Sequence, residues 1–210
     1  MANRSTKKAL IYEQLKSDII SGNIRSGEIL NEADLANRYG TGKTPTREAL
    51  LLLTHENLLD SMPRMGYMVS RLTTKDLLEI YYLRSILETE AVGLAVDRIT
   101  PEDIAHLEQN NQLESQIFSQ GSGRMNAQAY QLNREFHQII SHAAGNTRLE
   151  KIIIDLINDL ERALSFDPYI ADPAQHTELI ESLKTGSKTR AQDAMKVHLA
   201  ETRMRILNMF

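Results

Sequence analysis

Several polar side chains occupy positions where predicted helices face a hydrophobic interior. Asn133 and His137 lie one helical turn apart, at the edge of an apolar stripe that includes Leu132, Phe136 and Ile140. An amide and an imidazole beside a core are costly unless each has a hydrogen-bonding or metal-binding partner. The pair therefore indicates a site rather than ordinary packing.

Two further histidines occupy comparable positions. His176 precedes Leu179 and Leu183 by three and seven residues, and His198 follows Met195 by three, so both side chains face packed surface. In one interpretation, each histidine donates a hydrogen bond to a neighbouring carbonyl. In the other, the histidines bind a metal together, since imidazole suits zinc and nickel and three protein ligands leave positions for a small molecule.

A second polar group lies near the N-terminus, in the first turn of a predicted helix, and consists of Lys43, Thr44, Thr46 and Arg47. At the start of a recognition helix, such side chains contact bases and phosphates, and the backbone N–H groups favour a phosphate. Taken alone, this segment is equally typical of any well-capped helix. The order of the surrounding elements favours DNA binding.

These elements follow the order helix, helix, turn, helix, hairpin. A helix over residues 6–21 places Leu10 and Leu15 on one side, a second runs from an Asn31 cap to Gly40, and a third ends near residue 57. Two extended runs then flank residues 63–66, which is typical of a β-hairpin carrying Arg64 and Gly66 towards DNA. Residues 1–70 are therefore predicted to form a winged helix-turn-helix domain that binds double-stranded DNA.

The remaining chain, residues 71–210, shows helical periodicity and no strand pattern. Six helices are predicted near residues 74–98, 101–119, 124–143, 147–165, 173–185 and 187–209. The expected fold is mainly α, with an antiparallel six-helix bundle after the winged domain.

Composition limits the function further. The 210-residue chain has no cysteine, which excludes disulfides and thiolate ligands. It has no apolar run near the roughly 20 residues of a membrane span and no signal-peptide segment, which predicts a cytoplasmic protein without a membrane partner. Residues 1–70 carry a net charge of +1 and residues 71–210 carry −5, so only the first segment is suited to nucleic acid.

These motifs resemble those of the GntR family of transcriptional regulators. The matching segments are SGNIRSGEILNEADLANRYGTGKTPTREALLLLTHENLL, PRMGYMV, YLRSILETEAVGLA and NREFHQIISHAAGN. The last two, with His176 and His198, resemble the FCD ligand-binding domain of the FadR subfamily, and six body helices resemble its VanR-type branch. Lys43 and Thr46 stand where arginine and valine are common, so the operator is expected to differ from the usual palindrome.

The resemblance implies a divalent metal, with zinc or nickel expected, held by Asn133, His137, His176 and His198. Aspartate is usual at position 133. The neutral asparagine is expected either to lower metal affinity or to act only by hydrogen-bonding a metal-bound water. The resemblance also implies that Arg84, with Tyr81 nearby, holds a small carboxylate effector. The alternative for Arg84 is a surface ion pair with Glu88.

The prediction is thus a homodimeric repressor that binds a palindromic operator and is not an enzyme. One alternative is a metal-dependent hydrolase or lyase, but no HExxH-like pattern is present and residues 1–70 would have no role. Another alternative keeps DNA binding and makes the helical body a dimerisation bundle with a vestigial metal site.

Overall fold

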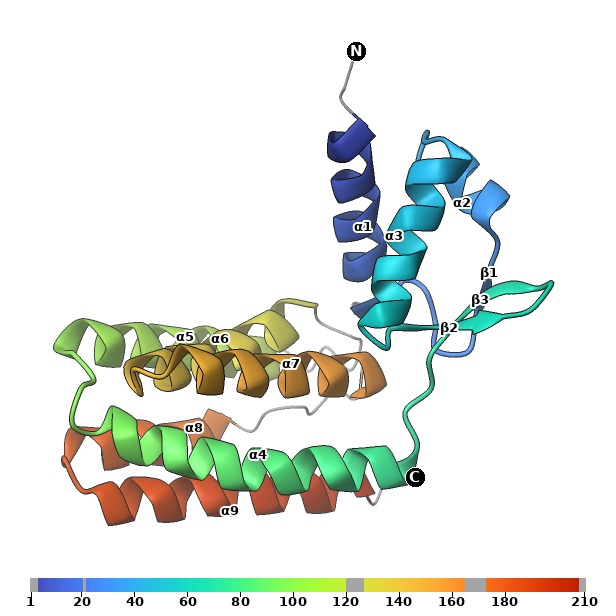
Figure 1. Ribbon diagram of the computed structural model, residues 1–210. Helices are drawn as coiled ribbons and strands as arrows, with labels where there is room; N and C mark the ends of the chain where they lie inside the picture. Colours follow the sequence, from blue (N-terminus) through green and yellow to red (C-terminus); the bar gives the residue numbers. More distant parts are fainter. Residues whose placement is uncertain (1–3, 21, 120–126, 165–172, 208–210) are drawn as a thin grey trace. The chain divides into compact units, whose positions relative to one another are not determined.

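The computed structural model describes residues 4–20, 22–119, 127–164 and 173–207. They form two compact units, Met1–Leu72 and Thr73–Phe210, which are called the N-terminal and C-terminal units (Figure 1). Parts of the predicted helices, at residues 21, 124–126, 165 and 208–209, lie outside the described residues.

The N-terminal unit combines helices with a small antiparallel sheet. Its elements are α1 (Arg4–Ile20), β1 (Ile29–Leu30), α2 (Glu32–Arg38), α3 (Lys43–His55), β2 (Leu59–Met62) and β3 (Gly66–Val69). β3 lies in the middle of the sheet and pairs with both β1 and β2. This order confirms the predicted winged helix-turn-helix fold.

The core of the N-terminal unit forms where α1 packs against α3. Ile11, Leu15 and Ile19 recur every four residues along α1, and they are buried with Leu50 of α3. The prediction that Leu10 faces inward is wrong, since its side chain is 61% exposed. The buried stripe on this helix consists of Ile11, Leu15 and Ile19, so the residue after Leu10 takes the inward position.

The β-hairpin is held close to β1. Gly66 has a φ of 114°, and a Cβ atom there would clash with the carbonyl oxygen of Leu30. Glycine is thus required at this position by both its backbone conformation and the close approach. Arg64, in the turn, also has a positive φ, 67°, which is uncommon outside glycine and asparagine. Its side chain is exposed.

The C-terminal unit contains six helices in the described residues, as predicted. They are α4 (Thr74–Ala95), α5 (Pro101–Ser119), α6 (Ala127–Ala143), α7 (Thr147–Leu164), α8 (Pro173–Lys184) and α9 (Lys188–Leu207). α4 is capped by Thr73, one residue before the predicted start, in a reciprocal pair with Asp76. None of the described helices has the length and apolar character needed to cross a membrane.

The core of the C-terminal unit joins most of its helices. Phe136 and Ile140 of α6 are buried with Leu107 of α5 and Leu179 of α8, and α4 packs along α9 (Figure 1). The faces of α6, α8 and α9 that bury these apolar side chains also bury His137, His176 and His198. The bundle therefore brings the histidines together.

Candidate metal centre and nucleic-acid interface

Three histidines from three helices meet inside the C-terminal unit. His137, His176 and His198 are all buried, and each offers a nitrogen that lies within 4.8 Å of the nitrogens of the other two. The Nε2 atoms of His137 and His198 are 3.3 Å apart. The ring of Phe136 stacks on His176 with 3.9 Å between centroids, which fixes that imidazole plane.

The outer nitrogen of His137 faces a buried ion pair. Its Nδ1 lies 2.6 Å from Oε2 of Glu88, and Oε1 of Glu88 accepts a hydrogen bond of 2.5 Å from Nε of Arg84. The guanidinium of Arg84 lies 5.6 Å from the ring centroid of Tyr81. The side chains of Arg84 and Glu88 are only 4% and 3% exposed, so the expected alternative of a surface ion pair is wrong.

The other two histidines are oriented in the same way. Nδ1 of His176 lies 2.7 Å from Oε2 of Glu114, a buried residue of α5. Nδ1 of His198 lies 3.0 Å from Oε1 of Gln175, whose Nε2 donates to Glu201 and so fixes the amide orientation. Carboxylate and amide oxygens behind imidazoles are the usual outer partners of metal-binding histidines.

The charges in this cluster differ from those of free side chains. Although burial alone would raise it, the charge of Arg84 lowers the pKa of Glu88 to about 2, so this carboxylate is ionised at neutral pH. Burial lowers the pKa of His137 and, together with the neighbouring imidazoles, lowers that of His198 well below the usual value. Both rings are therefore neutral at pH 7, which is the form that binds metals.

The arrangement leaves three acceptors facing one another. If each Nδ1–H points to its oxygen partner, the Nε2 atom of each neutral ring carries a lone pair and no hydrogen. Nε2 of His176 is buried and has no hydrogen-bond partner among the described residues. Three convergent lone pairs suit a shared cation, so this ligand set fits a divalent transition metal.

Asn133 lies one turn before His137 on α6, and its side chain is 6% exposed. Sequence reasoning did not identify Glu114, Gln175 or the role of Glu88 behind the histidines. Glu114 could have been found, because it follows Leu107 by seven residues and so lies on the buried face of α5. Gln175 gives no comparable signal, since it precedes His176 at the start of α8.

The predicted DNA-contacting residues divide into two groups. Lys43, Thr44 and Arg47 are exposed on the first turns of α3, as is Arg64 on the hairpin. Thr46 is fully buried, and its hydroxyl donates to the carbonyl oxygen of Gly42 at 2.9 Å. The Thr46 side chain therefore anchors the start of the recognition helix in this conformation, and its contact with DNA stays a prediction.

An acidic residue of α2 orients Arg47. Nε and Nη2 of Arg47 donate to the two carboxylate oxygens of Glu32 at 2.8 and 2.9 Å. This hydrogen bonding lowers the pKa of Glu32, so the pair stays ionised at neutral pH. The N-cap of α3 is Gly42, which supplies no side-chain cap for the first N–H groups. Those groups are suited to a phosphate oxygen.

Comparisons with known proteins agree with these two units. Residues 7–69 match the bacterial regulatory proteins of the gntR family, and residues 79–201 match the FCD domain. The chain belongs to the GntR family. Its two parts are thus the DNA-binding and FCD domains of a transcriptional regulator. The family and its members are transcriptional regulators, which confirms the prediction that this protein is not an enzyme.

Several relatives of this GntR-family chain are similar over most of their length. The HTH-type transcriptional regulator YdhC of Bacillus subtilis is 32% identical and covers 89% of this chain and 85% of its own. The regulator McbR of Escherichia coli is 31% identical and covers 91% of this chain and 86% of its own. The repressor GlaR of Escherichia coli is 28% identical over 90% of each.

Solved structures agree with this fold. The structure of Escherichia coli McbR/YncC has a TM-score of 0.78 and 27% identity, and covers 100% of this chain and 97% of its own. A GntR regulator from Rhodococcus has a TM-score of 0.81, and covers 98% of this chain and 99% of its own. At 18% identity, the Rhodococcus structure supports the fold alone.

Proposed function

We propose that this chain is a cytoplasmic repressor of the FadR type with a VanR-like helical body. It binds a palindromic operator as a homodimer. It responds to a small carboxylate that binds at a metal centre. Similar proteins named as repressors, including GlaR and RspR, support the sign of regulation. On the DNA side, the exposed group of Lys43, Thr44 and Arg47 provides contacts to bases and phosphates.

The metal centre is supported above all by the three convergent Nε2 atoms. His137, His176 and His198 would hold the ion, and Asn133 would add a neutral oxygen ligand or hydrogen-bond a bound water. When bound, the metal supplies coordination positions for an oxygen of the effector. Glu88, Glu114 and Gln175 hold the imidazoles in place from behind.

The effector would be a small organic acid rather than a long ligand. Arg84 has five N–H donors, and Glu88 accepts from its Nε. Arg84 would orient a carboxylate while remaining paired with Glu88, which also contacts His137. Tyr81, which is buried beside the guanidinium, would fix its position. Titration with a panel of small organic acids, monitored by melting shift and operator release, should find a ligand that requires the metal.

The homodimer is supported by an apolar stripe on α4. Leu78, Tyr82 and Ile86 recur every four residues and are 42%, 66% and 51% exposed. Such a row on one helix face suits an isologous contact with the same row of a second copy. Tyr82→Ser is expected to shift the sedimenting species towards monomer, while exchange of the exposed Glu102 of α5 for Gln leaves it unchanged.

Elemental analysis of the purified protein tests the metal centre directly. We expect the parent protein to contain zinc or nickel. The variants His137→Ala, His176→Ala and His198→Ala should each lose the metal. They should also melt at a lower temperature, since an ion that binds the folded state stabilises it. His106→Ala, an exposed histidine of α5, serves as the matched control. Asn133→Asp should tighten metal binding by adding a charge. Metal-free parent protein, with histidine variants that melt like the control, would reduce the cluster to hydrogen-bonded core residues.

A further inference from the structure

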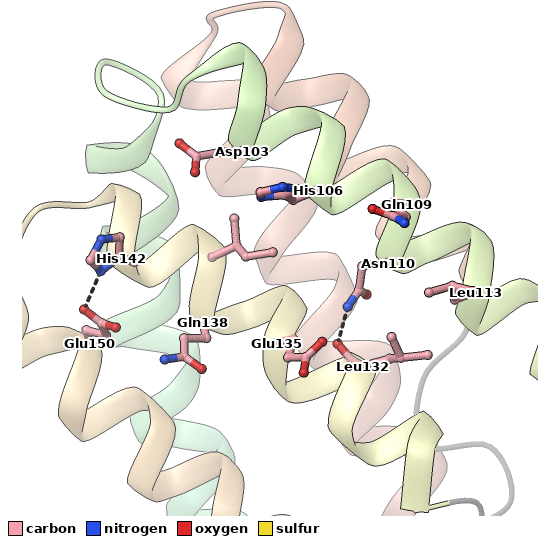
Figure 2. A pocket seen from close by; sticks show the side chains of 11 residues that line it. Asp103, His106, Gln109, Asn110, Leu113, Leu132, Glu135, Gln138, His142 and Glu150 are labelled. Atoms are coloured by element: carbon pink, nitrogen blue, oxygen red, sulfur yellow. Dashed lines mark hydrogen bonds and ion pairs between the residues drawn. The ribbon is translucent and has the colours of Figure 1, made fainter.

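A groove between α5 and α6 has a chemistry that the metal centre does not use (Figure 2). It has a volume of about 570 Å³, and neither the three buried histidines nor Arg84 lines it. Its lining includes the carboxylates of Asp103, Glu135 and Glu150 but no lysine or arginine. The groove therefore carries negative charge without a compensating cation in its wall.

The three carboxylates are held in place by side chains and backbone groups that carry no fixed positive charge. Asp103 accepts hydrogen bonds from the backbone N–H and the hydroxyl of Thr100, and Glu135 accepts one from Gln131 at 2.8 Å. Glu150 lies 3.1 Å from Nδ1 of His142. A carboxylate has about four lone-pair sites, so each can still accept a hydrogen bond from a ligand.

The floor of the groove contains a buried acceptor that has no donor. Asn110 is 6% exposed, and its Nδ2 donates to the carbonyl oxygen of Leu132 at 3.0 Å, which fixes the amide (Figure 2). Its Oδ1 is buried and has no hydrogen-bond partner in the described part of the chain. A buried amide oxygen without a donor is costly. A ligand N–H group would satisfy it.

The spacing of the charges suits an extended organic cation. Glu135 and His142, the partner of Glu150, are separated by seven residues on α6, which is about 10 Å along a helix. Leu132 and Ile139 provide apolar surface along this helix. These groups do not form a metal site, because the only group of histidine and carboxylate atoms close enough to hold an ion in the described residues is the buried histidine cluster.

We propose that this groove is a second ligand site, which binds a small aliphatic diamine or similar amine-bearing chain. One ammonium group pairs with Glu135 and the other with Glu150. The chain between them lies on Leu132 and Ile139, and the ammonium group at Glu135 also donates to Oδ1 of Asn110. This site is separate from the carboxylate site at the metal centre and selects ligands of the opposite charge.

Calorimetric titration of the full-length, zinc-loaded protein with heptanediamine tests this site. We expect heptanediamine to bind and to shift the side-chain amide signal of Asn110 in NMR spectra, while the uncharged heptanediol and the anionic heptanedioate do not bind here. Glu135→Gln and Glu150→Gln should each weaken binding about two- to fivefold, the range for exposed ion pairs, and the double variant about tenfold. Added salt should weaken binding as well.

The matched control removes two exposed carboxylates outside the groove, in the double variant Glu79→Gln/Glu102→Gln, and should bind heptanediamine like the parent. Protein stripped of zinc with a chelator should also keep amine binding, because the two sites share no residue. The proposal is overturned if heptanediamine in large excess gives no heat of binding. It is also overturned if heptanediol binds equally well, or if the Glu135→Gln/Glu150→Gln variant binds the diamine like the control.

Discussion

The two units of the molecule each contain an arginine paired with a glutamate, in opposite environments. In the N-terminal unit, Arg47 pairs with Glu32 through two hydrogen bonds, and its side chain is 65% exposed. In the C-terminal unit, Arg84 pairs with Glu88, and both side chains are almost completely buried. The same two residue types therefore serve different purposes.

Solvent determines this difference. Exposed ion pairs contribute little to stability, because water screens the charges and the side chains lose freedom on pairing. Glu32 thus orients Arg47 without holding it strongly, which leaves the guanidinium able to exchange its partner for a phosphate. The Arg84–Glu88 pair has lost its water and is joined to His137, so breaking it leaves an uncompensated buried charge.

The largest expected effect follows from this burial. Arg84→Ala removes one partner and leaves the carboxylate of Glu88 buried beside His137, which should cost about 3–5 kcal/mol of folding free energy. Chemical denaturation of the full chain, followed by circular dichroism, measures the loss. Arg47→Ala is the matched control and should unfold close to the parent. Equal stability of the two variants would contradict the assigned difference between the pairs.

A smaller effect is expected where a carboxylate acts only through a histidine. Glu114→Gln keeps the shape of the side chain but weakens the acceptor behind His176, so zinc affinity should fall about 10- to 100-fold. Competition with a chelator measures this loss. Glu108→Gln, an exposed change on the same helix, should leave zinc affinity unchanged. If the two variants bind zinc equally, Glu114 is only a hydrogen-bonding partner in the core.

The general fold was accessible from sequence because helical periodicity and glycine breaks are local signals. They give the six helices of the body and the order of the winged domain. The error at Leu10 shows the limit of this reasoning. Leu10 and Ile11 are both large and apolar, and only the position of α3 in the folded unit determines which one is buried.

The candidate site was partly predictable for the same reason. Each of the three histidines lies among apolar residues at helical spacing, so its inward direction is visible along one helix. Glu114 and Gln175 become meaningful only when α5, α8 and α9 pack together, which no local pattern encodes. The groove beside α6 was missed likewise, because His106 and His142 are ordinary surface residues when each helix is considered alone.

The exposed arginine gives a prediction about DNA rather than stability. Arg47→Ala should weaken operator binding, and if Arg47 contacts a phosphate, the slope of log affinity against log salt should become smaller by about one unit. Lys43→Ala and Arg64→Ala are expected to weaken binding as well. Mobility-shift titrations at several salt concentrations measure both quantities. Operator binding like that of the parent in all three variants would remove the recognition role of this surface.

The smallest expected effect separates two threonines of the recognition helix. Thr46 is buried and donates to the Gly42 carbonyl, so Thr46→Val should cost about 1 kcal/mol of stability, as is typical for a lost hydrogen bond. Thr44 is exposed in the same helical turn, so Thr44→Val should leave stability unchanged and weaken the operator complex. The two substitutions remove the same hydroxyl group, which makes each the control for the other. If Thr46→Val weakens DNA binding at full stability while Thr44→Val has no effect, the recognition helix presents a different face to DNA from the one that is exposed here.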